Sequence, residues 1–95
     1  MGAAARQGDT IQTNHEGDEY TVAAGCSSDC FVNGRGVPRY GDQTAPHLKG
    51  GKLHTVPLVR ASGQVFVNGK GAGMVGSVYG DNEVVIGGSA DTFFG

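Results

Sequence analysis

The chain has 95 residues, of which 18 are glycine and 3 are proline, and its formal net charge at pH 7 is −2. The glycines follow no three-residue period, which excludes a collagen-like chain. The near balance of charges leaves no basic footprint, so we expect neither a nucleic-acid partner nor stable membrane insertion. Valine dominates the large aliphatic residues and prefers strands, while abundant glycine disfavours long helices. Together these features predict one small all-β domain, spanning residues 1–95, with many tight turns.

The start of the chain and its cysteines bear on where the protein is made. Residues 1–9 contain no apolar stretch typical of a signal peptide, and no apolar run approaches the roughly 20 residues that span a bilayer. Two cysteines, Cys26 and Cys30, are too few for a disulfide framework, and a reducing compartment disfavours a bond between them. We therefore expect synthesis in the cytoplasm without a signal peptide.

An internal repeat organises the sequence. Residues 27–34 read SSDCFVNG, residues 62–69 read SGQVFVNG, and residues 89–95 read SADTFFG. The segment after each copy repeats as well: GRGVPRYGD at 34–42 aligns with GKGAGMVGS at 69–77, and AAARQGD at 3–9 supplies the remaining member. The pattern predicts three units, approximately 3–34, 36–69 and 71–95.

Each unit is expected to form a hairpin. Short strands over 30–32 and 65–67 end in Asn-Gly, a strong signal for a two-residue turn. Such short hairpins are unstable alone, so they must pack on one another, which predicts pseudo-threefold symmetry. We expect the return strands at 37–40 and 72–75, and projecting loops or short hairpins at 10–25, 43–61 and 78–88.

The repeated phenylalanines and aspartates have simple structural interpretations. Phe31, Phe66 and Phe93 are expected in the core, with the neighbouring backbone contacting a partner by strand addition. Asp9 and Asp42 directly follow turn glycines, where a carboxylate accepts backbone N–H groups, so we read them as turn residues rather than paired catalytic acids. The GAGMVG sequence at 71–76 lacks the following helix that a dinucleotide site requires.

The segment at 3–9 resembles the Pro-Ala-Ala-Arg-x-Gly-Asp signature of PAAR-repeat proteins, and the Phe-Val-Asn-Gly copies resemble other recurrent pieces of that family. The resemblance covers essentially the whole chain. It implies a small conical fold of three hairpins with a metal near its point. It also implies a structural role without enzymatic activity. One copy would cap a trimeric β-helical spike protein at the tip of a type VI secretion spike or a contractile phage tail, and help it to penetrate an envelope.

The sequence departs from the family pattern at three positions. Pro38 replaces the second alanine of the motif in the second unit, Met74 stands where arginine is expected in the third, and Ser77 stands where aspartate is expected. The arginine and aspartate interactions of the motif are therefore expected only in the first two units.

The histidines are candidate metal ligands. His15 follows the first Gly-Asp by six residues and His47 follows the second by five, so equivalent inserts would bring them together. His54 lies in the same insert as His47, across a Gly-Gly turn. Neutral imidazole is a common zinc ligand, and a structural zinc site takes four ligands. We therefore expect a metal site that contains these three histidines and binds zinc or, alternatively, iron.

The sequence offers more than one candidate for the fourth ligand of this metal site. In the family a cysteine lies a few residues past the third Gly-Asp, and the residue there in this chain is Asp81. Cys26 and Cys30 are the softer alternatives, and Cys26 is preferred because the position of Cys30 is occupied by packed residue types in the other units. Without a fourth ligand, three histidines and a water would suit a small zinc-dependent hydrolase. A zinc-stapled adaptor domain is a further alternative.

Overall fold

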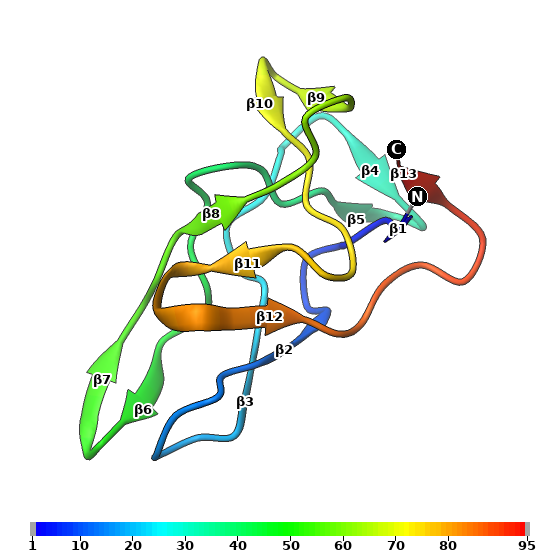
Figure 1. Cartoon of the computed structure of the whole chain (residues 1–95). Coiled ribbons are helices and arrows are strands. Elements are labelled where there is room, and N and C mark those ends of the chain that lie inside the picture. Colours follow the sequence, from blue (N-terminus) through cyan, green and yellow to red (C-terminus); the bar gives the residue numbers. More distant parts are fainter. Residues whose placement is uncertain (1, 95) are drawn as a thin grey trace.

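The computed structural model describes residues 2–94 (Figure 1), and its strands are all short. The body measures 35 × 23 × 22 Å. None of the helical segments among residues 2–94 has the length and apolar character needed to cross a membrane. In chain order the elements are β1 (Gly2–Ala3), β2 (Thr10–Gln12), β3 (Tyr20–Val22), β4 (Phe31–Val32), β5 (Arg35–Gly36), β6 (His47–Lys49), β7 (Lys52–His54), β8 (Leu58–Arg60), β9 (Phe66–Val67), β10 (Lys70–Gly71), β11 (Val78–Tyr79), the 3-10 turn η1 (Gly80–Asn82), β12 (Glu83–Val85) and β13 (Phe93–Phe94). The expectation of an all-β protein is confirmed.

Three antiparallel strand pairs share one register. Strand β4 pairs with β5, β9 with β10, and β13 with β1, and in each pair the first phenylalanine lies opposite a small residue. These pairs are Phe31 with Gly36, Phe66 with Gly71, and Phe93 with Ala3. The third pair joins segments from the two ends of the sequence, in agreement with the alignment of residues 3–9 to the other copies. Gly95, which the repeat assigns to the third unit, and Met1 lie outside the described residues.

The hairpins turn at the two Asn-Gly pairs. Asn33 and Asn68 both have φ of 53°, and the glycines that follow, Gly34 and Gly69, both have φ of 77°. Positive φ at both central residues defines the two-residue turn whose twist matches that of the flanking strands. Pairing therefore resumes at once, in β5 and β10. The prediction of return strands at 37–40 and 72–75 was wrong, because the return strands are two residues long, at 35–36 and 70–71. Beyond them Arg39, Ala72 and Met74 form single bridges to neighbouring units instead.

Equivalent hydrogen bonds tie each hairpin to the Gly-Asp-type turn of a neighbouring segment. In each case a backbone N–H just before the turn glycine donates to the carbonyl of the small residue opposite the phenylalanine. The three bonds, each 2.8 Å long, run from Gln7 N to Gly36 O, from Tyr40 N to Gly71 O, and from Val75 N to Ala3 O. The repeat in the sequence thus corresponds to a repeated set of main-chain contacts.

The turns themselves are closed by side chains. Asp9 accepts a hydrogen bond from the Arg6 backbone N–H at 2.7 Å and pairs with the guanidinium of the same residue. Asp42 holds Arg39 in the same way. In the third turn, Ser77 Oγ accepts the backbone N–H of Met74 at 3.0 Å. The turn role of both aspartates is confirmed, and the serine retains the backbone contact although no guanidinium is present.

The three inserts do more than project from the body. Their strands combine into one antiparallel sheet in the order β3-β2-β12-β11-β8. The separate hairpin β6–β7 extends beyond this sheet, at the end of the molecule opposite the three repeated hairpins (Figure 1). Strands from different inserts therefore share hydrogen bonds, which fixes the loops between them relative to one another.

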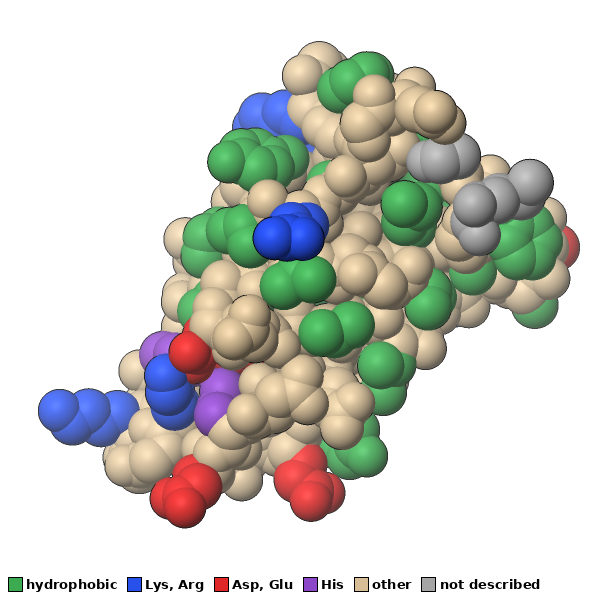
Figure 2. Space-filling model, viewed as in Figure 1, with side chains coloured by type: hydrophobic (Ala, Val, Ile, Leu, Met, Phe, Trp, Pro, Cys, Tyr) green, Lys and Arg blue, Asp and Glu red, His purple; other side chains and the backbone are tan. Residues whose placement is uncertain are grey.

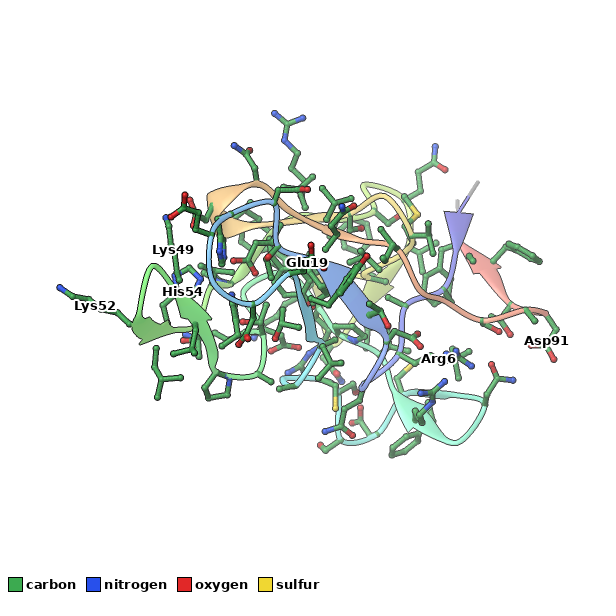
Figure 3. All side chains as sticks on the ribbon, turned by 90° about the horizontal axis from the view of Figure 1, so that it is seen from below. Arg6, Glu19, Lys49, Lys52, His54 and Asp91 are labelled. Carbon is green, nitrogen blue, oxygen red and sulfur yellow. The ribbon has the colours of Figure 1, made fainter. Side chains whose placement is uncertain are left out.

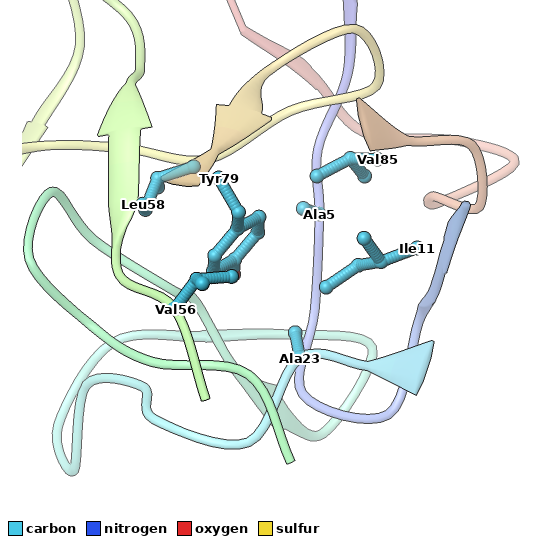
Figure 4. Packing of buried hydrophobic residues seen from close by; sticks show 7 residues of the cluster. All are labelled: Ala5, Ile11, Ala23, Val56, Leu58, Tyr79 and Val85. Carbon is cyan, nitrogen blue, oxygen red and sulfur yellow. The ribbon is translucent and has the colours of Figure 1, made fainter. Parts of the chain in front are cut away.

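The interior consists of two small clusters of mostly small aliphatic side chains. One lies under the five-stranded sheet (Figure 4) and comprises Ala5, Ile11, Ala23, Val56, Leu58, Tyr79 and Val85. The other lies among the repeated hairpins and comprises Ala4, Val32, Val37, Val67 and Ala72, with Cys30 and Val65 packed against it. A chain of this size has a limited core, so contacts other than apolar packing contribute a larger share of its stability.

The prediction that the repeated phenylalanines belong to the core was wrong. Phe31, Phe66 and Phe93 are 57%, 60% and 53% exposed. The next residue in the first two strands, Val32 or Val67, is buried instead. Successive side chains of a strand point to opposite faces, so burying the valines turns the phenylalanines outward.

Polar side chains also link neighbouring units. Asn68 Oδ1 accepts from Arg39 at 3.0 Å and lies 2.8 Å from Ser27 Oγ, while its Nδ2 donates to Asp29 at 3.0 Å. An equivalent set joins Asn33 to Arg6, Ser89 and Asp91. The turn asparagines thus connect different units, the second with the first and the first with the third, as well as forming the turns.

These links predict a loss of stability in acid. Hydrogen bonds from Asn68 and Ser27 lower the pKa of Asp29, and those from Asn33, Ser89 and Thr92 lower the pKa of Asp91, both from an ordinary 3.8. A carboxyl group whose pKa is lower in the folded chain stabilises the fold above its unfolded pKa, and this contribution is lost as pH falls through the folded pKa. We expect the midpoint temperature of thermal unfolding to decrease as the pH is lowered below about 4. In the Asp29→Asn/Asp91→Asn variant this decrease should be less steep. Calorimetry against pH tests this, and parallel curves for the two proteins would contradict it.

Candidate metal centre

The three histidines and one glutamate converge from all three inserts. His15 lies in the loop between β2 and β3, and His47 and His54 lie directly opposite each other in the β6–β7 hairpin. Glu83 begins β12, immediately after the turn η1. The hairpin register therefore places two imidazoles on one face, and the five-stranded sheet brings the other two residues to them.

The donor atoms meet at one point. Glu83 Oε2 lies 2.7 Å from His15 Nε2, 2.8 Å from His47 Nε2 and 3.0 Å from His54 Nε2. His47 Nε2 and His54 Nε2 are 2.8 Å apart. One ligand atom from each of the four residues falls within 4.8 Å of all the others. The His15 and His47 rings stack, and the His54 ring is nearly perpendicular to both.

Backbone carbonyls set the tautomer of two of these rings. His15 Nδ1 lies 2.9 Å from Glu16 O, and His47 Nδ1 lies 2.9 Å from Ala45 O. A carbonyl oxygen only accepts, so each Nδ1 carries its proton. In the neutral ring the Nε2 lone pair then faces the carboxylate oxygen of Glu83, and the two would repel. A cation between them removes this conflict, and an outer hydrogen bond on Nδ1 is the usual arrangement for metal-bound histidine.

The group is nearly closed to solvent. The side chains of His15, His47 and Glu83 are 9%, 2% and 0% exposed, and that of His54 is 23% exposed. Glu83 Oε1 is also buried and has no hydrogen-bond partner among the described residues. A buried carboxylate with a free oxygen is costly unless a charge compensates it. These residues therefore fit a divalent cation, since imidazole nitrogen with carboxylate oxygen suits zinc and iron alike. They can hold a metal ion, and such a closed set would serve structure by adding binding energy to folding.

The surroundings of His15 make it sensitive to pH. Burial lowers the pKa of its imidazole, but the hydrogen bonds to Glu16 O and Glu83 and the nearby carboxylates outweigh burial, so the pKa is raised above 6.5. A metal must displace any proton at Nε2, so acid competes with metal at this nitrogen.

The structure brings together all three histidines named from the sequence and places Glu83 fourth. Neither Cys26 nor Cys30 belongs to the group. Cys26 lies against Gly36, where a side chain would meet its sulfur, and Cys30 packs on the cluster among the hairpins. Both cysteines are free thiols. Asp81 lies outside the group and pairs with Lys49 at 2.5 Å.

A signal for Glu83 was present in the spacing. It follows Ser77 by six residues, just as His15 follows Asp9 by six. The family pattern drew attention to Asp81 instead. Burial of a glutamate in a turn-rich insert is not visible from sequence.

A scan against protein-family models gives no match to this chain, and the curated proteins contain no significant match either.

The ligand set predicts which substitutions abolish metal binding. We expect His47→Ala and Glu83→Gln to weaken Zn²⁺ binding by more than the roughly 10–100-fold typical of outer-shell changes. Cys26→Ser should bind zinc like the wild type, because its sulfur lies outside the group. Metal content by plasma mass spectrometry and affinity by chelator competition measure both effects. Zinc loss in Cys26→Ser with retention in Glu83→Gln would refute the assignment.

Removal of metal should also lower stability. A ligand that binds only the folded chain, present at 1,000 times its Kd, stabilises it by about 4 kcal/mol. For a domain of this size that corresponds to a thermal midpoint raised by about 15 °C or more. Scanning calorimetry after EDTA treatment, with and without added Zn²⁺, tests this; an unchanged midpoint would mean that the group binds no structural metal.

Proposed function

We propose that the protein is a PAAR-type spike tip, which caps a trimeric β-helical spike with three equivalent hairpins and is stapled by a metal near its opposite, leading end. The observation that carries the proposal is the repetition of one exposed phenylalanine at the same register of three hairpins. A single chain has little use for three equivalent aromatic side chains in solvent. A partner with threefold symmetry would meet all three in the same way.

The hairpins also offer main-chain groups to such a partner. Each is a two-stranded sheet among the described residues, so β4, β9 and β13 each have a strand partner on one side only. An unpaired strand edge is a template for strand addition, and leaving it uncovered favours aggregation. A trimeric β-helix ends in open strands that could cover these edges. Apolar contact through the phenylalanines and pairing through the backbone would then act together.

The end of the molecule opposite the three repeated hairpins would form the leading tip of the spike. Figure 2 shows the histidine side chains at this end, with several Lys, Asp and Glu side chains around them, while hydrophobic side chains are spread along the rest of the visible face. The hairpin β6–β7 and the loop between β2 and β3 form this end (Figure 1). Such loops have few apolar contacts of their own. A metal held by His15, His47, His54 and Glu83 would cross-link all three inserts and resist deformation under load.

The geometry favours this function over a zinc hydrolase. A hydrolytic site holds the metal with three protein ligands and leaves a position for water. Here Glu83 offers a fourth ligand atom, and three of the four side chains are nearly buried. The arrangement is typical of a closed structural site.

Binding to a spike trimer tests the proposal. We expect one copy of the protein to bind one recombinant β-helical spike trimer from the same organism. The Phe31→Ser/Phe66→Ser/Phe93→Ser variant should bind at least about 100-fold more weakly, because buried aromatic anchors contribute about 2 kcal/mol or more each. Light scattering gives the stoichiometry, and interferometry gives the affinity.

A matched control is Leu53→Ser, which removes a highly exposed apolar side chain from the opposite end. It should bind the trimer like the wild type. Equal binding by the triple variant would remove the phenylalanines from the interface. Absence of any trimer binding by the folded, metal-loaded wild type would favour an independent adaptor domain.

A further inference from the structure

The four ligand side chains of the centre differ in their exposure to solvent. His54 is the most exposed of the four ligand side chains, and Glu83 is completely buried. A cation must therefore enter past His54. The side chains next to His54 therefore influence the rates at which the metal binds and dissociates.

Asp81 and Lys49 form a partly exposed ion pair beside this opening, with Lys49 Nζ 2.5 Å from Asp81 Oδ2. Lys49 is two residues from His47 in β6, and Asp81 is two residues before Glu83. Asp81 also interacts electrostatically with both His15 and His54. Figure 3 shows Lys49 and His54 at the same end of the molecule, in the β6–β7 hairpin.

The backbone holds Asp81 in an unusual conformation. Its φ is 66° and that of Asn82 is 59°, both in the left-handed region that residues other than glycine seldom adopt. Asn14 Nδ2 donates to Asn82 O at 2.9 Å, which ties this turn to the loop that carries His15. The turn that carries Asp81 is thus tied to the first insert, whereas Lys49 is held to the Asp81 carboxylate only by a partly exposed ion pair. Such pairs are weak, so the lysine can move away easily.

We propose that Asp81 is the entry ligand of the centre: its carboxylate takes up a divalent cation from solvent as Lys49 moves aside, and passes it to the imidazoles and Glu83. This inference rests on the proposed metal centre and adds to it a residue that acts on the rates of binding. Carboxylate oxygen binds divalent cations readily and exchanges them easily. After transfer, Lys49 pairs with Asp81 again and covers the opening.

An entry ligand has a kinetic signature that a simple surface ion pair lacks. Substitution of a group that acts on the entry route but not in the final complex changes the association and dissociation rates by the same factor and leaves Kd unchanged. Removal of a fifth, permanent ligand would instead raise the dissociation rate and so weaken binding. Removal of an ion pair without any role in metal binding would change neither rate.

The experiment follows Co²⁺ binding to metal-free protein by stopped-flow absorbance, and release of Co²⁺ to excess EDTA. Asp81→Asn should slow both processes by about 10-fold, at the low end of electrostatic steering effects, with Kd unchanged. Lys49→Met should accelerate both, because the carboxylate is then free. Glu19→Gln, which removes the same charge from a loop near the centre, should match the wild type.

The outcomes separate this inference from the metal centre itself. If wild type binds Co²⁺ and Asp81→Asn does so at the same rates, or only releases it faster, the entry role is refuted and the centre stands. If folded wild type binds no Co²⁺, both proposals fail. Circular dichroism of each variant verifies the fold, and the opposite effects expected for the two variants exclude a general loss of structure.

Discussion

The burial of the Glu83 carboxylate is the constraint on which the end of the molecule formed by the β6–β7 hairpin and the loop between β2 and β3 depends. A charge without solvent must be compensated by nearby partners, and here one oxygen faces three imidazoles while the other has no partner among residues 2–94. The partners come from the other two inserts. A cation that compensated this one group would therefore hold together three loops whose tips contribute no residue to either apolar cluster.

The two ends of the molecule obey different symmetries, for physical reasons. At the hairpin end the same residue types recur three times, with the same register and the same 2.8 Å hydrogen bonds. At the other end a group of four ligand atoms cannot be divided equally among three units. The second insert contributes two of these residues, His47 and His54, and the first and third contribute one each, His15 and Glu83. The threefold repeat therefore does not extend to the residues that could hold a metal ion.

Small size explains why polar contacts carry so much of the fold. The two apolar clusters contain mainly alanine and valine, and Tyr79 is the largest buried side chain. Main-chain bonds between units, aspartate-closed turns and the asparagine links therefore add to a modest hydrophobic contribution. A metal would add stability at the end formed by the β6–β7 hairpin and the loop between β2 and β3, which lies outside both apolar clusters.

The sequence by itself determined the local features of this protein. Valine and glycine content predicted the all-β class, Asn-Gly pairs predicted two turns, and the spacing of the histidines predicted that they meet. These are properties of short segments, which depend on backbone preferences and register. Even so, the local pattern placed Phe31, Phe66 and Phe93 inside, because an aromatic residue in a short strand can occupy either face.

Only the tertiary structure decided which face of each strand is buried and which residue completes the centre. The valines of β4 and β9 fill the space between hairpins, and the phenylalanines are left outside. Glu83 joins the histidines because β12 pairs with β2, a contact between segments far apart in the sequence. Cys26 and Asp81 are equally plausible ligands by residue type. Long-range pairing, which no local pattern encodes, positions Glu83 at the centre and leaves the other two outside the group.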